Sequence, residues 1–148
     1  MNVEQIIKTE KELSLQSRTI IHFMLINNKI TEALGIALKP FEVSLQQFNV
    51  LRILRGQFGK PANLSTLNDR MVTKRSNTTR LVDKLIKKGF VDRIICPSNR
   101  RKVEISITSD GKKALKQMDT AMKEAEKSIL KNMSESDLKQ LNSLFNKF

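Results

Sequence analysis

Residues 73–90 read TKRSNTTRLVDKLIKKGF, and the prediction of the fold starts from this segment. Apolar residues one helical turn apart predict a helix over residues 74–88 with one buried face. Thr73 is the expected N-cap, and Gly89 is expected to end the helix. The predicted buried face consists of Leu81, Val82, Leu85 and Ile86. Residues 74–80 contain no large apolar residue, so the front of this helix is expected to face outward.

Two shorter helices are expected before this stretch. The first is capped by Ser44 and ends in the glycine-containing segment 56–59. The second starts at Asn63 or Ser65 and reaches Met71. This second helix is followed, after a tight turn, by the helix over residues 74–88. Two helices joined in this way are typical of a helix-turn-helix.

A hairpin is expected after it, because the apolar period changes to two. Residues 91–96 and 102–107 read as strands, and residues 97–101 join them as a tip that carries two arginines. A helix-turn-helix followed by a basic hairpin forms a winged helix-turn-helix. The predicted fold class is therefore mainly α with a small β-hairpin wing.

Longer helices flank this region. One helix is expected from Val3 to Leu38, ended by Pro40. Thr108 or Ser109 caps another that runs to about residue 132, and a last helix starts near Ser134. Their apolar faces are too long for one subunit to bury, so we expect a symmetric homodimer. The predicted organisation is one domain over residues 1–148, with dimerisation helices at 1–43 and 109–148 and a DNA-binding region at 44–108.

The charge is concentrated in the middle of the chain. The 148 residues carry a net charge of +12, from 27 Lys and Arg against 15 Asp and Glu. Residues 44–107 hold fourteen basic and four acidic side chains, a net of +10. Such a concentration indicates a binding face for a polyanion, with nucleic acid as the leading partner and a membrane surface as the other polyanion to weigh.

Composition also narrows the function classes. One Cys and one His are too few for a disulfide framework or a Cys/His zinc site, so we expect no cofactor and no metal. No acid, base or nucleophile constellation stands out, and an enzyme is not expected. No run of about 18 apolar residues exists, so we expect a cytoplasmic protein without a membrane partner.

The candidate site residues follow from the shape of B-DNA. Its major groove admits a helix and shows a distinct donor and acceptor pattern for each base pair, so short polar and basic residues in the first turns can read it. The candidate base-reading residues are Arg75, Ser76, Asn77 and Arg80. The candidate phosphate contacts are Lys74 and Thr79. Arg100 and Arg101 at the hairpin tip are expected to enter or straddle the adjacent minor groove.

Several motifs in register make the chain resemble one known family. The stretches that carry the resemblance are LQQFNVL (45–51), SNTTRLVDKL (76–85), KGFVDR (88–93), NRR (99–101) and ITSDG (107–111). Over residues 44–115 they resemble the multiple-antibiotic-resistance regulator (MarR) family. The resemblance implies a homodimeric winged-helix transcription factor, usually a repressor relieved by a small-molecule effector or by thiol oxidation. It also implies that Ser76, Asn77, Thr79 and Arg80 lie in the recognition helix and that Arg101 is the wing arginine.

The chain departs from the family pattern at two positions. Asn99 stands where the wing motif usually has Asp, so the charge-assisted bond bracing the wing arginine becomes a neutral one. Leu67-Asn68 stands where Leu-Ala is common, and this larger polar side chain must find a partner or point to solvent.

Four other residues have structural interpretations that we favour over functional ones. Cys96 is expected to be a half-buried strand residue rather than a redox sensor, and His22 a core or interface residue. The pair Met118 and Met122 is expected to pack in the interface, and Phe58 to be a hydrophobic plug. The alternative function is non-sequence-specific nucleic-acid binding, as an architectural or RNA-binding protein. Trp and Tyr are absent, which disfavours a single-strand binder that stacks bases on aromatic rings.

Overall fold

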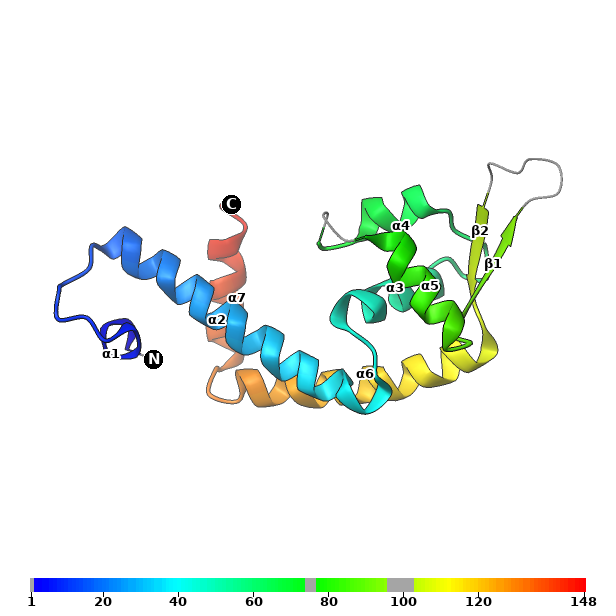
Figure 1. Ribbon diagram of the computed structural model, residues 1–148. Coiled ribbons are helices and arrows are strands. Elements are labelled where there is room, and N and C mark those ends of the chain that lie inside the picture. Colours follow the sequence, from blue (N-terminus) through cyan, green and yellow to red (C-terminus); the bar gives the residue numbers. More distant parts are fainter. Residues whose placement is uncertain (1, 74–76, 96–102) are drawn as a thin grey trace.

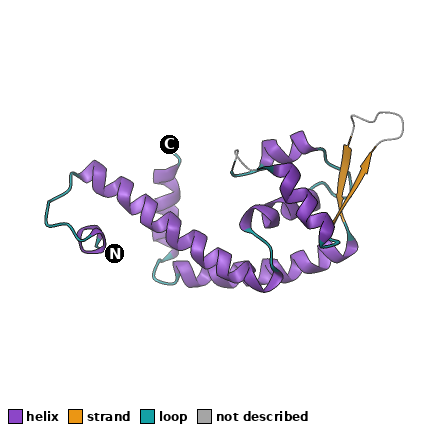
Figure 2. Cartoon of the chain, viewed as in Figure 1, coloured by secondary structure: helices purple, strands orange, loops and turns teal. Residues whose placement is uncertain are grey.

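The computed structural model describes residues 2–73, 77–95 and 103–148 (Figure 1). Over these residues the chain is mostly helical and has one two-stranded antiparallel sheet (Figure 2). In chain order the elements are α1 (Val3–Ile7), α2 (Leu15–Leu38), the 3-10 helix η1 (Lys39–Phe41), α3 (Leu45–Arg55), α4 (Leu64–Arg70), α5 (Thr78–Lys87), β1 (Val91–Ile95), β2 (Val103–Ile107), α6 (Ser109–Leu130) and α7 (Glu135–Phe145). The predicted fold class is confirmed.

The core lies at one end of an elongated molecule. In Figure 1, α3, α4, α5 and the hairpin form a lobe above one end of α6, while α1, α7 and most of α2 lie at the other end. The residues of the core are Leu38, Val43, Phe48, Val50, Leu51, Leu54, Ala62, Leu67, Met71, Val82, Leu85, Val91, Ile105, Leu115, Met118 and Met122. They come from the lobe, the last residue of α2 and the part of α6 from Leu115 to Met122. Among the described residues, no helix is long and apolar enough to cross a bilayer.

The predicted cap Ser44 starts α3, and it forms a capping box with Gln47. The Ser44 hydroxyl accepts a hydrogen bond from the Gln47 amide at 3.2 Å, and the Gln47 side chain accepts one from the Ser44 amide at 2.8 Å. Two of the four amides that lack a partner at a helix start are thereby satisfied. The helix ends at Gly56, so both predicted boundaries are confirmed.

The prediction of one helix over Val3–Leu38 is wrong. The helix α1 ends after five residues because Lys8 adopts a left-handed conformation, with φ of 55°. The next amide, that of Thr9, then bonds back to the Glu4 carbonyl at 3.1 Å, which closes the end of α1. Apolar spacing does not reveal such a break, because the spacing continues on both sides of it.

A second helix, α2, starts after a short connection and lies against α1. Ser14 is its N-cap and accepts a hydrogen bond from the Ser17 amide at 3.2 Å. The Glu4 carboxylate and the Arg18 guanidinium form an ion pair with N···O of 2.6 Å. This contact joins α1 to the first turns of α2, and the Arg18 hydrogen bond contributes to a lowered pKa of Glu4, after the larger effect of a backbone hydrogen bond.

The hairpin is attached to the rest of the lobe through a third chain segment. β1 and β2 pair antiparallel, with Val91 opposite Ile107 and Ile95 opposite Val103. On the other side of β2, the amide and carbonyl of Ile105 exchange hydrogen bonds of 2.7 and 2.9 Å with Ala62, which precedes α4. The base of the wing is therefore hydrogen-bonded to the helix-turn-helix. Residues 96–102, including Cys96 and Asn99, lie outside the described residues.

A glycine allows α6 to start close to the hairpin. The predicted cap Thr108 accepts a hydrogen bond from the Gly111 amide at 2.9 Å and donates one to the Gly89 carbonyl at 2.7 Å. A Cβ atom at Gly111 would lie 2.1 Å from the Phe90 carbonyl oxygen. Only glycine permits this approach without a backbone shift, which explains the glycine in the segment 107–111.

Two packing expectations are wrong. Phe58 is not a plug: its side chain is 94% exposed, in a turn where its φ is 52°. Met118 and Met122 are buried in the core of their own chain rather than left for an interface. His22 is partly buried on α2, and whether it belongs to an interface stays a prediction.

Candidate nucleic-acid interface

The helix α5 begins later than its sequence predicts. Its N-cap is Asn77 and not Thr73: the Asn77 Oδ1 atom accepts a hydrogen bond from the Arg80 amide at 3.1 Å. Both residue types are good N-caps, so local preference does not choose between them. Burial of Thr78, the first residue of α5, accompanies the later start.

The exposed face of α5 carries the predicted polar residues that the structure describes. Thr78, Val82 and Leu85 are buried inside the lobe, whereas Thr79, Arg80 and Lys84 are exposed. Asn77 is exposed as well. The other predicted site residues lie outside the described residues: Lys74, Arg75, Ser76, Arg100 and Arg101. Asn77, Thr79 and Arg80 are thus the predicted site residues that the structure places together.

A shallow hollow opens on this face between α5 and the first turn of α3. Its volume is about 320 Å³. It is lined by Gln46, Asn77, Arg80, Leu81 and Lys84. Gln46 and Lys84 were missed by the sequence analysis. Lys84 could have been predicted, because it follows Arg80 by one helical turn. Gln46 lies in the hollow because α3 packs against α5, and the sequence contains no signal for that contact.

The hollow is cationic. Among the described residues, neither Arg80 nor Lys84 has a carboxylate partner, although both lie on the same exposed surface. The acid between them in sequence, Asp83, is engaged elsewhere: its Oδ1 atom lies 2.8 Å from an Arg93 guanidinium nitrogen. Two cations around a concave surface favour an anionic partner such as a phosphate group.

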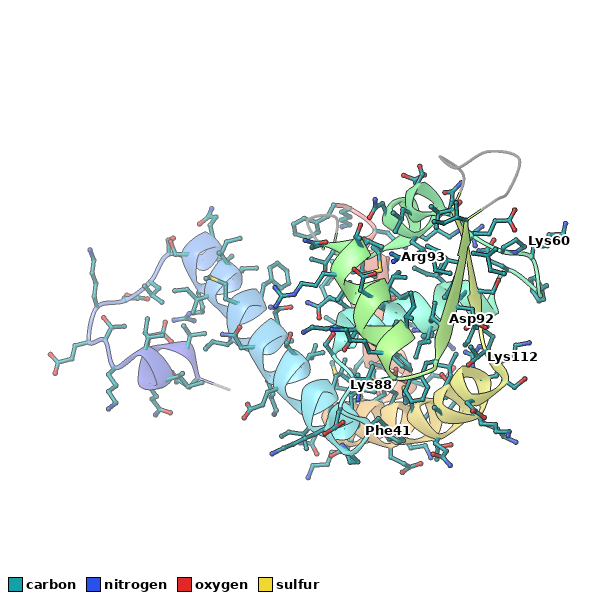
Figure 3. The ribbon with its side chains drawn as sticks, turned by 45° about the vertical axis from the view of Figure 1, so that its right-hand side comes forward. Phe41, Lys60, Lys88, Asp92, Arg93 and Lys112 are labelled. Carbon is teal, nitrogen blue, oxygen red and sulfur yellow. The ribbon has the colours of Figure 1, made fainter. Side chains whose placement is uncertain are left out.

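The ion pair of Asp83 with Arg93 also joins the two elements that would contact a duplex. Arg93 lies on β1 beside α5 (Figure 3). Both side chains are partly exposed, so the pair contributes little to stability, about 0–1 kcal/mol. Its effect is geometric: it holds the base of the wing next to the exposed face of α5.

A second ion pair lies at the other end of α5. The Lys88 ammonium donates a hydrogen bond to the Glu42 carboxylate at 2.9 Å, and Lys88 is labelled in Figure 3. That hydrogen bond, followed by the Lys88 charge, lowers the pKa of Glu42. The C-terminal end of α5 is thereby joined to the turn that precedes α3.

Comparison with known proteins agrees with this geometry. Residues 43–103 match the model of the MarR family. The uncharacterized HTH-type transcriptional regulator YfiV of Bacillus subtilis (strain 168) is 35% identical over 72 residues, which are 49% of this chain. The matched segment spans 44% of that relative's length. The resemblance to the MarR family predicted from the sequence is confirmed.

Solved structures resemble the chain over most of its length. A putative MarR-like transcription regulator from Bacillus cereus matches with a TM-score of 0.79 and 20% identity, covering 90% of this chain and 96% of that one. A MarR transcription factor from Planctomyces limnophilus matches with a TM-score of 0.73 and 27% identity, covering 93% of this chain and 100% of that one. A mutant of MarR from E. coli, complexed with operator DNA, matches with a TM-score of 0.75 and 24% identity. The match covers 90% of this chain and 93% of that one. The helices that flank residues 43–103 therefore share the fold of these proteins too.

Proposed function

This chain carries a MarR-family winged helix over residues 43–103, and from that premise we propose that it is a sequence-specific regulator of transcription that binds double-stranded DNA. The observation that carries the proposal is the exposed cationic face of α5, where Arg80 and Lys84 line one hollow. A MarR mutant of the same fold is complexed with operator DNA, which supports the proposal. Such a function requires the compartment that holds DNA, in keeping with the expected cytoplasmic location.

In the proposed complex α5 enters the major groove. Arg80 reads base edges, because a guanidinium can bond two acceptors of guanine at once. Lys84 and Thr79 contact phosphates, which set the position of the protein without carrying sequence information. The remaining roles follow the sequence analysis: Arg75, Ser76 and Asn77 read bases, Lys74 binds phosphate, and Arg100 and Arg101 contact the minor groove.

The proposed active species is a homodimer. The end of the molecule away from the lobe has little of its own core: α2 buries only Leu38 among its side chains, and α7 buries none. The large apolar residues left exposed there are Ile6, Ile7, Leu15, Ile20, Met24, Ile26, Ile36, Leu130, Met133, Leu144, Phe145 and Phe148. A second copy of the chain covers these residues, and two-fold symmetry then relates the two lobes. The operator is accordingly a pseudo-palindrome with half-sites about 34–36 Å apart.

The proposed mode of regulation is repression that a small-molecule effector relieves. An effector relieves repression only if it binds more tightly to a dimer in which the distance between the two α5 helices does not match the spacing of the half-sites. The junction between the lobe and α6 is the place where such a preference can act. There α3 and α6 enclose a hollow of about 140 Å³, next to the ion pair of Arg55 with Asp119.

Selection of duplexes from a random library by the purified chain tests the proposal. We expect the recovered duplexes to share a pseudo-palindrome, and to be bound about 10³-fold or more tightly than random duplexes at the same salt concentration. Affinity for both should fall steeply as salt rises, because a dimer of charge +24, twice +12, releases many counterions. Recovery of sequences without a common motif would instead establish the alternative, non-sequence-specific binding.

A further inference from the structure

The first residue of α5 is a threonine that is almost fully buried. Thr78 is 4% exposed, and a buried hydroxyl is costly unless it is hydrogen-bonded. Its Oγ1 atom donates a hydrogen bond to the Oδ1 atom of Asn68 on α4. The bond therefore links the two helices of the helix-turn-helix at the end of α5 that carries the candidate base-reading residues.

Apolar side chains also pack between α4 and α5. Leu67 and Met71 from α4 and Val82 from α5 are buried in the same core. Apolar cores tolerate small shifts with repacking, whereas a hydrogen bond requires a narrow range of distance and angle. The bond between Asn68 and Thr78 is thus a directional contact that specifies where the first turn of α5 lies against α4.

The exposed face moves with this first turn. Asn77, which directly precedes Thr78, accepts hydrogen bonds from the amide of Arg80 through its side chain and from the amide of Leu81 through its carbonyl. A displacement of Thr78 is therefore passed to Asn77 and Arg80, two of the candidate base-reading residues. It changes their distance from a base edge without removing any group that contacts DNA.

We propose that Asn68 is a positioning residue for sequence-specific recognition, holding the first turn of α5 in place through Thr78. The inference rests on the proposed DNA-binding function. Asn68 acts on the choice of sequence and not on the attraction to phosphate.

The test compares Asn68→Ala with the wild type on two duplexes of equal length, the one selected above and one of random sequence. We expect affinity for the selected duplex to fall roughly tenfold, as on loss of one bidentate base contact. Affinity for the random duplex should change less than about twofold, because phosphate contacts are less sensitive to helix position. Ser65→Ala, an exposed position on the same helix, is the matched control and should alter neither. An unchanged ratio of the two affinities in Asn68→Ala overturns the proposal.

A double variant distinguishes a positioning role of the bond from a contribution to stability alone. Asn68→Ala combined with Thr78→Val removes both partners of this bond, so it should recover the thermal midpoint that Asn68→Ala loses. It should not recover the ratio of affinities, because no directional bond is restored. Thr78→Ser keeps the hydroxyl and should keep the wild-type ratio. Recovery of the ratio in the double variant overturns the proposal.

A measurement on the free protein keeps this inference distinct from the proposed function. If the wild type shows no sequence preference, the proposed function fails, but amide hydrogen exchange still reports the position of α5. The amides of Arg80 and Leu81 should exchange at least about tenfold faster in Asn68→Ala than in the wild type, and at the wild-type rate in Ser65→Ala. Equal exchange in Asn68→Ala and the wild type overturns the positioning role itself.

Discussion

Three side chains on α5 show how the role of a residue depends on its backbone position. Asn77 precedes the first turn, and its amide oxygen is engaged as the cap of the helix. Arg80 and Lys84 lie one turn apart on the exposed face and have no carboxylate partner among the described residues. Of the described site residues, Arg80 is therefore the one whose whole side chain is available for bidentate recognition, and Lys84 supplies a point charge.

Substitution of these two cations should separate base reading from phosphate binding. Arg80→Ala should weaken binding to the selected duplex by about 1–3 kcal/mol and relax its sequence preference. Lys84→Ala should weaken binding to selected and random duplexes alike, and lower the salt dependence by about one ion. Titration of both variants on both duplexes at several salt concentrations measures this. Equal losses on both duplexes for Arg80→Ala would contradict its role as a base reader.

Helix ends in this chain are set by side-chain caps. Each of the seven α-helices over the described residues has an N-cap side chain that accepts a backbone hydrogen bond; the caps are Asn2, Ser14, Ser44, Asn63, Asn77, Thr108 and Ser134. The start of α7 is a capping box, in which Ser134 donates to the Asp137 carboxylate through its hydroxyl at 2.7 Å and its amide at 2.8 Å. These bonds, the hydroxyl first, lower the pKa of Asp137.

The cap of α7 should therefore weaken in acid. A lowered pKa in the folded chain means that the ionised carboxylate is the form that stabilises the fold. Its contribution is present above the ordinary aspartate value, near pH 4, and is lost as the pH falls through the lower folded value. Amide exchange at Ser134, followed from about pH 5 down to about pH 2 and corrected for intrinsic rates, should show the cap opening. Asp137→Asn keeps an acceptor but does not titrate, so its profile should be flat; a profile like that of the wild type would assign the opening to another group.

At the scale of the whole molecule, burial is uneven. The lobe and α6 as far as Met122 have a continuous core, but the opposite end leaves large apolar side chains in solvent. Phe23 on α2 packs against Phe145 and Phe148, with ring centroids 6.0 and 5.8 Å apart, and yet Phe148 remains 94% exposed. Contacts within one chain therefore do not cover this end, and a second copy is the partner that we propose.

Light scattering at micromolar concentration should give a mass of about 34 kDa, twice the 17.0 kDa of one chain. Placing charge on the uncovered face by Ile20→Glu together with Met24→Glu should shift the mass toward 17.0 kDa, because an interface cannot bury unpaired carboxylates without cost. Ile94→Glu on β1 is the matched control, since Ile94 is 60% exposed and Ile20 55%. It should leave the mass unchanged. A wild-type mass of 17.0 kDa would remove the homodimer from the proposal.

Features that depend on neighbours along the chain can be predicted from the amino-acid sequence. The cap at Ser44 with Gln47 three residues later, the change of apolar period after Phe90 and the cap at Thr108 each act within a few residues. Local hydrogen bonds and side-chain alternation are enough to specify them. The fold class, the order of the elements from α3 onward and the polar front of α5 were predictable for this reason.

Features that depend on contacts between distant residues become visible only in the folded molecule. Two good caps, Thr73 and Asn77, compete for the start of α5, and the later one is the one that begins the helix where buried Thr78 bonds Asn68 on α4. The ion pair of Glu4 with Arg18 spans the break that apolar spacing could not reveal. Gln46 reaches the cationic hollow, and Met118 the core, through packing between helices. Such contacts bring together residues with no fixed spacing in sequence, so periodicity and composition contain no signal for them.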